Sequence, residues 1–498
     1  MPVHDKVKYY ALNKAAHTAV NIEEQTLSWQ QLFQRALSIF AAIAQNPAKE
    51  QTIAVALGND LEFAPAWLAA TANKNVCAVI DPQLPTEQLR DVLNRLSPRL
   101  LLLRHSQTAI IALAKSLNID CLPIEDVENL ADEHLHTYED AFVQDVNATT
   151  PFLINFTSGT TSTPKAFMRS RHSWRECFRN GQQIFDLPTA SSTLFPGPLF
   201  HGIGLYCLNE SLDAGTSFYC MQKWQASKAL EIILTYQVQR LVLVPTMLTA
   251  FARLESFDAQ YFSSITHLLS AGAKLEMNHY RTARRLFPHA RIQEYYGASE
   301  LGFIAVSTLD DENVERQLPT VGLPFPEVSW SIRDEHGRPL AQNKPGFIYL
   351  TSAQVCSGYL WGDDGNAFKT ESWGSTVRDI GYINPQGQLH VIGRSGDMVI
   401  SGGNNIYLSE IESVLKSLPE VIEAVVLAVD DEYLGKKAIA FFESNILETD
   451  QLPALCRSQL AKYKIPAQFC KLDHWPLTPS GKIKRSVLEK MYINHEIK

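Results

Sequence analysis

The stretch NFTSGTTSTPK, from Asn155 to Lys165, follows an apolar run and ends in a lysine. The apolar run, Pro151 to Ile154, is typical of a buried strand. Serine, threonine, glycine and proline are common in surface linkers, which is one interpretation of the stretch. The same residues suit a loop that wraps a polyphosphate with N–H and O–H donors while a lysine neutralises charge. The stretch alone leaves both interpretations open.

A P-loop nucleotide site is excluded by spacing. The pattern GxxxxGK[ST] is absent from NFTSGTTSTPK and from the rest of the chain. A phosphate-binding role for the stretch therefore depends on motifs elsewhere in the sequence.

The composition is that of a large globular protein. Its 498 residues exceed what one hydrophobic core usually serves, so we expect a large body and at least one further domain. Hydrophobic residues make up 45% and charged residues 19%, which excludes a disordered or fibrous protein. The net charge of -9 argues against a nucleic-acid-binding protein, because that function needs a basic face.

The cysteines and the hydropathy indicate a cytoplasmic location. The eight cysteines form no CxxC pair and no metal-ligand spacing, which fits reduced thiols rather than a disulfide scaffold or a zinc site. The N-terminus lacks a signal-peptide pattern, and no run of about 18 apolar residues occurs. We therefore expect a soluble cytoplasmic protein without a transmembrane segment; peripheral membrane contact stays open.

Helix and strand patterns alternate over the first 320 residues. A helical pattern over 28–46 is followed by an apolar run over 52–57, a second helical pattern over 61–75 and a second apolar run over 76–81. Further apolar runs, each followed by helix-compatible sequence, are RLLLLR, LINFT, TLFPGPL, TSFYCM and RLVLVP. The alternation predicts an α/β fold with parallel sheets covered by helices.

The texture of the sequence changes twice towards the C-terminus. From about residue 321, short strands separated by Gly, Pro and Asn turns predict a β-rich subdomain. After Arg394, a glycine-rich joint precedes helix, strand, turn and strand, which predicts a small α+β domain. We therefore expect a large N-terminal domain over 1–393, a hinge at 394–396 and a small mobile C-terminal domain over 397–498.

Five motifs, in order along the chain, resemble the adenylate-forming superfamily of acyl-CoA synthetases, peptide-synthetase adenylation domains and luciferases. They are TSGTTSTPK at 157–165, YGASE at 296–300, RDIGYI at 378–383, GRSGDMVISGGNNIYLSEIE at 393–412 and PSGKIKR at 479–485. The resemblance covers residues 28–490. Within the superfamily, the sequence looks most like fatty or aryl acyl-CoA ligases. It implies that a carboxylate attacks the α-phosphate of MgATP to give acyl-AMP and pyrophosphate, and that a thiol then takes the acyl group.

The resemblance also implies a set of nucleotide-binding residues. Glu300 would bind Mg²⁺ together with Thr160, since a hard cation prefers oxygen ligands. Tyr296 would stack on the adenine, Asp379 would accept hydrogen bonds from the ribose hydroxyls, and Arg394 would face the ribose or a phosphate. The phosphate loop would consist of Thr157, Ser158, Gly159, Thr160, Thr161 and Lys165. Further nucleotide contacts would come from Gly272, Ala273, Tyr295, Gly297, Ala298 and Ser299.

The resemblance gives catalytic roles to Lys482, Glu300 and His201. The small domain would deliver the ammonium group of Lys482 to the carboxylate and the α-phosphate. His201, in LFHGIGLY, would lie beside the carboxylate pocket, although a histidine of the core is the alternative. Relatives that activate amino acids commonly carry an aspartate near this position; its absence here favours another carboxylic acid. Gly402 and Gly403 would flank the approach of the thiol, unless a turn requires them.

Three residues depart from the family pattern, and the identity of the acceptor stays open. Ser162 stands where a glycine is usual, Arg378 stands in place of the glycine of Thr-Gly-Asp, and Gly396 stands where an Asp or Lys serves as a pivot. The implied cofactors are ATP, Mg²⁺ and CoA. The thiol belongs either to CoA or to the phosphopantetheine of a separate acyl carrier protein; a catalytically silent nucleotide-binding protein is a third interpretation.

Overall fold

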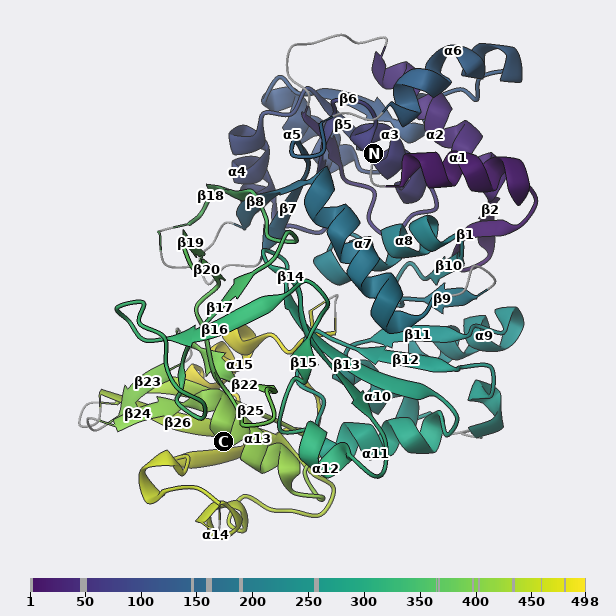
Figure 1. Cartoon of the computed structure of the whole chain (residues 1–498). Helices are drawn as coiled ribbons and strands as arrows, with labels where there is room; N and C mark the ends of the chain where they lie inside the picture. The colour runs from purple at the N-terminus through teal and green to yellow at the C-terminus, as the bar shows by residue number, and fades with distance from the viewer. Residues whose placement is uncertain are drawn as a thin grey trace.

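Two mixed sheets form the large N-terminal part of the chain in a computed structural model (Figure 1). The structure describes residues 3–44, 52–144, 147–157, 164–187, 191–254, 259–363, 365, 368–395, 398–401, 404–431, 435–457, 459–478 and 481–497.

The first sheet has seven strands within these described ranges. Its order is β18 (Gly358–Trp361), β8 (Lys165–Ser170), β7 (Pro151–Thr157), β4 (Val76–Val79), β3 (Thr52–Val55), β5 (Leu100–Leu103) and β6 (Asp120–Pro123). The five strands from β7 to β6 are parallel, because helices connect them: α3 (Phe63–Thr71), α4 (Thr86–Leu96), α5 (Thr108–Ser116) and α6 (Asp132–Val143). Helices α1 (His4–Asn13) and α2 (Trp29–Ala44) pack beside α3 and α6.

The second sheet has nine strands among the described residues. Its order is β15 (Leu323–Pro324), β14 (Gly302–Leu309), β13 (Arg291–Ala298), β12 (His267–Ser270), β11 (Arg240–Leu243), β9 (Ser192–Leu194), β10 (Ser217–Cys220), β1 (Thr18–Ile22) and β2 (Gln25–Ser28). The helices that accompany it are α7 (Arg171–Phe185), α8 (Gly202–Ala214), α9 (Ala226–Tyr236), α10 (Pro245–Ala252), α11 (Met277–Leu286) and α12 (Val314–Gln317). The six strands from β13 to β1 run parallel.

The prediction of helix-covered parallel sheets is therefore confirmed for the interior strands and wrong at the edges. LINFT, which forms the end of β7, is followed by the antiparallel strand β8 rather than by a helix. The apolar residues Ala166, Phe167 and Met168 continue the sheet, and the helical pattern begins only at Arg171. The prediction was wrong because β8 directly precedes a helix, so its six residues resemble the beginning of that helix.

The β-rich subdomain and the small domain follow in the predicted order. A third sheet contains β16 (Ser329–Arg333), β17 (Gly346–Thr351), β19 (Lys369–Glu371), β20 (Gly374–Thr376), β21 (Asp379–Ile383) and β22 (Leu389–Arg394). The small domain contains β23 (Met398–Ser401), β24 (Asn404–Tyr407), α13 (Leu408–Ser417), β25 (Glu423–Asp431), β26 (Gly435–Glu443), α14 (Leu452–Arg457), β27 (Gln468–Lys471) and α15 (Arg485–Ile493). It packs around its own apolar core, which includes Ile411, Val426 and Phe442.

The small domain lies against helices α10 and α11 at one end of the molecule, as its yellow-green elements show in Figure 1. The hydroxyl of Thr246 donates to the carbonyl oxygen of Gly481 at 2.6 Å. The amide of Asn278 donates to the carbonyl oxygen of Val421 at 2.7 Å, just after α13. These contacts join the small domain to the large domain. The boundary at 393–397 stays a prediction, and Gly396 lies outside the described residues.

No helix among the described residues has the length and hydropathy needed to cross a membrane. All eight cysteines are free, and seven of them are buried. The free thiols agree with the cysteine spacing in the sequence, which indicated no disulfide scaffold.

A buried ion pair connects helix α8 to strand β11. Arg240 donates to Glu210 Oε2 at 2.7 Å, and the two side chains are 3% and 0% exposed. The Arg240 guanidinium also lies 5.4 Å from the centre of the Phe185 ring. Because both charges are removed from water, each requires the other. The pair holds α8 in a fixed position relative to the second sheet.

Replacing Glu210 by alanine leaves the charge of Arg240 buried without its partner. We expect Glu210→Ala to lower the free energy of unfolding by about 3–5 kcal/mol. Urea unfolding followed by circular dichroism measures the change. The matched control is Arg95→Ala, which breaks an exposed pair with Asp91 and should cost less than about 1 kcal/mol. Equal losses in the two variants would contradict a structural role for the buried pair.

Candidate active site

A series of hydrogen bonds and electrostatic interactions connects six of the motif residues with His201 and Tyr359. It passes from the end of β7 through two tyrosine–carboxylate pairs to two cations and a histidine. Its members are Thr157, Tyr359, Glu300, Tyr296, Asp379, Arg394, Lys482 and His201. Residues from both domains therefore meet at one place.

Glu300 lies in the turn between β13 and β14, and a tyrosine orients its side chain. The hydroxyl of Tyr359 donates to Glu300 Oε1, and Thr157 forms a side-chain hydrogen bond with Tyr359. Burial and the neighbouring carboxylate raise the pKa of Tyr359 above its ordinary value, so the tyrosine remains a donor at neutral pH. Glu300 Oε2 accepts no hydrogen bond within the described part of the chain. One carboxylate oxygen is thus left for a ligand.

Asp379 is the second oriented carboxylate. The Tyr296 hydroxyl donates to its Oδ2, while Arg394 Nε lies 3.2 Å from its Oδ1. Burial raises the pKa of Asp379, and the charge of Arg394 opposes that shift. Burial and the charge of Asp379 raise the pKa of Tyr296 well above its usual value. The guanidinium of Arg394 stays largely exposed, so it is accessible from the domain boundary.

Arg378, the departure from the family pattern, adopts a left-handed conformation with φ of 63°. Its N–H donates to the hydroxyl of Thr376 at 2.9 Å, and its guanidinium lies 4.5 Å from the centre of the Phe347 ring. Arg378 therefore adopts a left-handed turn conformation that glycine adopts more easily. The arginine side chain is directed to Phe347 of the β-rich sheet.

Lys482 reaches the large domain from the small domain. A Cβ atom placed on Gly272 would lie 3.3 Å from Lys482 Cε and 3.2 Å from Ile203 Cδ1. Gly272 follows strand β12 and has φ of +81°, which favours glycine. Burial and the positive charge of Arg394 lower the pKa of Lys482, although part of the side chain remains accessible. The end of the Lys482 side chain therefore lies next to Gly272, where the two domains meet.

His201 immediately precedes helix α8 and lies near this lysine. Burial and the positive charge of Lys482 lower the pKa of His201 to about 4. The imidazole is therefore neutral at physiological pH and offers a hydrogen-bonding group without a charge. Its ring centre lies 4.8 Å from that of Phe200.

The remaining predicted residues occupy different surroundings. Tyr295 packs against Phe185 and Phe303, because successive residues of β13 point to opposite faces of the sheet. The carbonyl oxygen of Ser299 accepts from Arg169 at 2.7 Å. A Cβ atom on Gly297 would lie 2.6 Å from the carbonyl oxygen of Gly302, so this position requires glycine.

Several predicted residues lie at the ends of strands or outside the described ranges. Ala273 is exposed after Gly272, Ala298 ends β13, and Lys165 begins β8. Predicted residues outside the described ranges are Ser158, Gly159, Thr160, Thr161, Gly402 and Gly403, together with Ser162. The individual roles of all these residues remain predictions.

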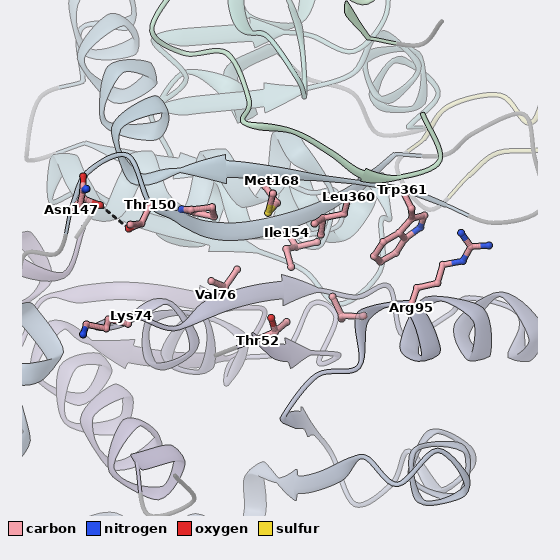
Figure 2. Close-up of a pocket in the computed structure, with 12 residues that line it drawn as sticks. Thr52, Lys74, Val76, Arg95, Asn147, Thr150, Ile154, Met168, Leu360 and Trp361 are labelled. Atoms are coloured by element: carbon pink, nitrogen blue, oxygen red, sulfur yellow. Dashed lines mark hydrogen bonds between the residues drawn. The ribbon is translucent and has the colours of Figure 1, made fainter. Parts of the chain in front are cut away.

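A cavity of about 630 Å³ lies on the face of the first sheet opposite to Tyr359 and Glu300. Figure 2 shows Ile154, Met168 and Leu360 along it, with Lys74 and Arg95 at opposite ends. Leu360 lines this cavity, whereas the adjacent Tyr359 contacts Glu300, as expected for neighbouring residues of one strand. The cavity is therefore separate from the candidate active site.

The sequence analysis missed Tyr359, which orients Glu300. It lies in SGYLW, a strand segment without a recognised motif, and reaches Glu300 because β18 pairs with β8. A tyrosine at an ordinary strand position gives no signal before that pairing is known.

Comparisons with known proteins agree with the geometry. A family model described as "AMP-binding enzyme" matches residues 7–360, and a model described as "AMP-binding enzyme C-terminal domain" matches residues 410–482. A curated relative from Bacillus subtilis (strain 168), described as the uncharacterized acyl–CoA ligase YhfT, is 31% identical over 90% of this chain and 89% of its own length. The medium-chain acyl-CoA ligase ACSF2, mitochondrial, of Mus musculus is 29% identical over 69% of this chain and 58% of its own.

A solved structure is similar over nearly the whole chain. The o-succinylbenzoate CoA synthetase (MenE) of Bacillus subtilis, in complex with the acyl-adenylate intermediate OSB-AMP, is 25% identical with a TM-score of 0.82 and 98% coverage of both chains. The same synthetase in complex with ATP and magnesium ion is 24% identical with a TM-score of 0.80, covering 97% of this chain and 99% of its own.

The neutral state of His201 can be measured directly. We expect the imidazole of His201 to titrate near pH 4 by NMR of labelled histidine, because burial and Lys482 both disfavour its charge. Lys482→Met removes the second cause and should raise the pKa of His201. Lys490→Met, which changes a lysine on α15, is the control and should leave the pKa unchanged. A His201 pKa near 6.5 in the unmodified protein would contradict the arrangement.

Proposed function

The chain belongs to the AMP-binding enzyme family, and from this premise we propose that it activates a carboxylic acid with ATP and passes the acyl group to CoA. The relatives described as acyl-CoA ligases support the reaction class. One structural observation carries the proposal for this chain: Lys482 of the small domain lies next to Gly272 of the large domain, close enough for its charge to lower the pKa of His201. A lysine delivered between domains suits chemistry that depends on positioning and charge.

In the first step, a carboxylate oxygen of the acid attacks the α-phosphorus of ATP. The bond between the α-phosphorus and the bridging oxygen breaks, and pyrophosphate leaves with that electron pair. The ammonium of Lys482 would hold the attacking carboxylate and an α-phosphate oxygen together and offset the negative charge of both. The imidazole of His201 would lie beside the acid. Because it is neutral, it would not form an ion pair with the carboxylate in place of Lys482.

The nucleotide would lie along the two oriented carboxylates. Asp379, fixed by Tyr296 and Arg394, would accept the ribose hydroxyls, because an ionised carboxylate can accept two hydrogen bonds. The loop between β7 and β8 would cover the β and γ phosphates. The crystal complexes of MenE with ATP and with OSB-AMP support a nucleotide in this fold.

The residues fit magnesium that arrives with ATP rather than a resident metal ion. Within the described residues no group of three or more His, Cys, Asp or Glu side chains could hold a metal. Glu300 has one carboxylate oxygen without a hydrogen bond, and Mg²⁺ commonly combines one or two carboxylates with substrate phosphates and water. When bound, the ion would neutralise phosphate charge. Tyr359 would keep the Glu300 side chain oriented for this role.

In the second step, the sulfur of a thiol attacks the acyl carbonyl carbon. The bond to the AMP oxygen breaks, the thiol proton passes to solvent, and AMP leaves. CoA is the proposed thiol because the named relatives are CoA ligases. A carrier-protein phosphopantetheine is the alternative, and supplying each acceptor in turn separates the two. The free cysteines support a cytosolic site for this reaction.

Removing the ammonium group tests the first step. We expect Lys482→Ala to reduce acid-dependent ATP–pyrophosphate exchange by at least about 100-fold, because it removes a charge that acts in the transition state. Transfer to CoA from chemically prepared acyl-AMP should change much less, and ATP should still bind. Lys490→Ala is the matched control and should retain both activities. Full exchange activity in Lys482→Ala would remove this lysine from the mechanism.

The lowered pKa of Lys482 makes the first step sensitive to alkaline pH. The lysine must be protonated, so the rate of exchange should fall as pH rises through a pKa below 10.5. Arg394→Gln removes one positive neighbour, which raises the pKa of Lys482 and moves the alkaline limb to higher pH. Rates at saturating ATP measure the limb.

Arg338→Gln serves as the control for this titration, because Arg338 pairs with Asp334 outside the site. Its alkaline limb should coincide with that of the unmodified enzyme. A limb that stays in place or moves to lower pH in Arg394→Gln would contradict the proposed coupling between Arg394 and Lys482.

A further inference from the structure

Helix α8 has one face that is accessible at its start and closed further along. Gly202, Ile203 and Tyr206 are partly exposed, whereas Gly204, Leu205 and all residues from 207 to 210 are buried. Ile203, Tyr206 and Glu210 lie on one face, because residues three, four and seven apart are neighbours on a helix. The partial exposure of this face therefore begins at the first turn of α8 and stops after Tyr206.

The open end of this face adjoins the proposed reaction centre. Ile203 Cδ1 and Lys482 Cε both approach the position that a Cβ atom on Gly272 would take, at 3.2 Å and 3.3 Å. Val244 Cγ1 lies 3.4 Å from the same point. A carboxylate held by Lys482 would thus have its tail between Ile203 and Val244, directed along α8.

Tyr206 is held firmly in place at the closed end. Its hydroxyl oxygen lies 3.1 Å from Glu210 Oε1 and 3.1 Å from the carbonyl oxygen of Cys177. Glu210 in turn accepts from Arg240 at 2.7 Å. The Tyr206 ring packs edge-on against Phe303, with ring centres 4.8 Å apart. Turning Tyr206 aside would leave a buried carboxylate without one of its donors, which is unfavourable.

We propose that Tyr206 forms the floor of the acid pocket and restricts the enzyme to short-chain aliphatic monocarboxylic acids; the inference rests on the proposed function. From Gly202 to Tyr206 is four residues, or about 6 Å of helix. Helical side chains also lean towards the N-terminus, which brings the tyrosine ring closer to Ile203. With C–C bonds of about 1.5 Å, this depth accommodates about four carbons beyond the carboxylate.

The lining favours an apolar tail over a second acid group. Ile203, Val244 and Phe303 supply hydrocarbon surface. The charge of Arg240, which acts on Tyr206, is already offset by Glu210. A second carboxylate at the end of the tail would therefore meet a neutral ion pair and lose hydration without compensation.

The unmodified enzyme provides the first test. Straight-chain acids from acetate to dodecanoate are compared in ATP–pyrophosphate exchange, using kcat/KM. We expect the highest value between three and six carbons and a fall of at least about 100-fold by ten carbons, since a closed pocket rejects added length. Equal activity with butyrate and decanoate would overturn the proposal.

Two variants test the residue itself. Tyr206→Ala removes the ring and should increase kcat/KM for decanoate relative to butyrate by at least about tenfold. Tyr206→Phe keeps the ring without the hydroxyl and is the matched control, with the chain-length profile of the unmodified enzyme. A folded Tyr206→Ala variant with an unchanged profile would overturn the role of Tyr206. If that variant does not fold, Tyr206→Leu replaces it with the same expectation.

Binding without turnover separates this inference from the proposed function. Non-hydrolysable acyl-sulfamoyl adenosines with butyryl and decanoyl tails are compared by calorimetry. Tighter binding of the butyryl compound, by at least about tenfold, supports the closed pocket even if no acid supports exchange. Equal binding of both compounds overturns the inference, even if the enzyme activates carboxylic acids.

Discussion

The arrangement depends on a positive charge placed where the two domains meet, without a negative partner among the described residues. No carboxylate of the described residues pairs with Lys482, and the cation Arg394 is among its neighbours. Two contacts outside the centre oppose this repulsion: Thr246 binds Gly481 next to the lysine, and Asn278 binds the segment after α13. The small domain therefore positions the ammonium by its own packing. A polyphosphate is complementary to such a site, because an anion relieves the repulsion between the two cations.

The two carboxylates of the site, unlike the ammonium of Lys482, have hydrogen-bonding partners among the described residues that orient them. Glu300 and Asp379 each accept a hydrogen bond from a tyrosine, Tyr359 and Tyr296 respectively. A tyrosine hydroxyl fixes the direction of a carboxylate without bringing a positive charge to it. The four partners come from three sheets: β13 and the turn after it, β18, and β21. The geometry of the acids therefore depends on how these sheets pack, rather than on one flexible loop.

This dependence explains which parts could be predicted from the sequence. Apolar runs such as RLVLVP predicted interior strands correctly, because burial on both faces leaves a continuous apolar signature. Motifs such as YGASE indicated residues that then lay together. Tyr359 and Tyr206 gave no such signal, since each is an ordinary aromatic residue until β18 pairs with β8 and α8 packs on Phe303. The antiparallel pairing of β7 and β8 was missed because the six residues of β8 resemble the start of the helix that follows them.

The proposed pocket floor and the reaction centre share one rigid frame. Arg240 and Gly272 belong to or directly follow adjacent strands, β11 and β12, which pair in parallel from Arg240 and His267 to Leu243 and Ser270. Arg240 holds Glu210, Glu210 holds Tyr206, and all three are connected to helix α8, whose first turn follows His201. The distance from Gly272 to the floor is therefore set by the strand register and the rise of one helix. A substitution at Tyr206 changes the length of that space, whereas the backbone that positions His201 and Gly272 is fixed independently by the sheet.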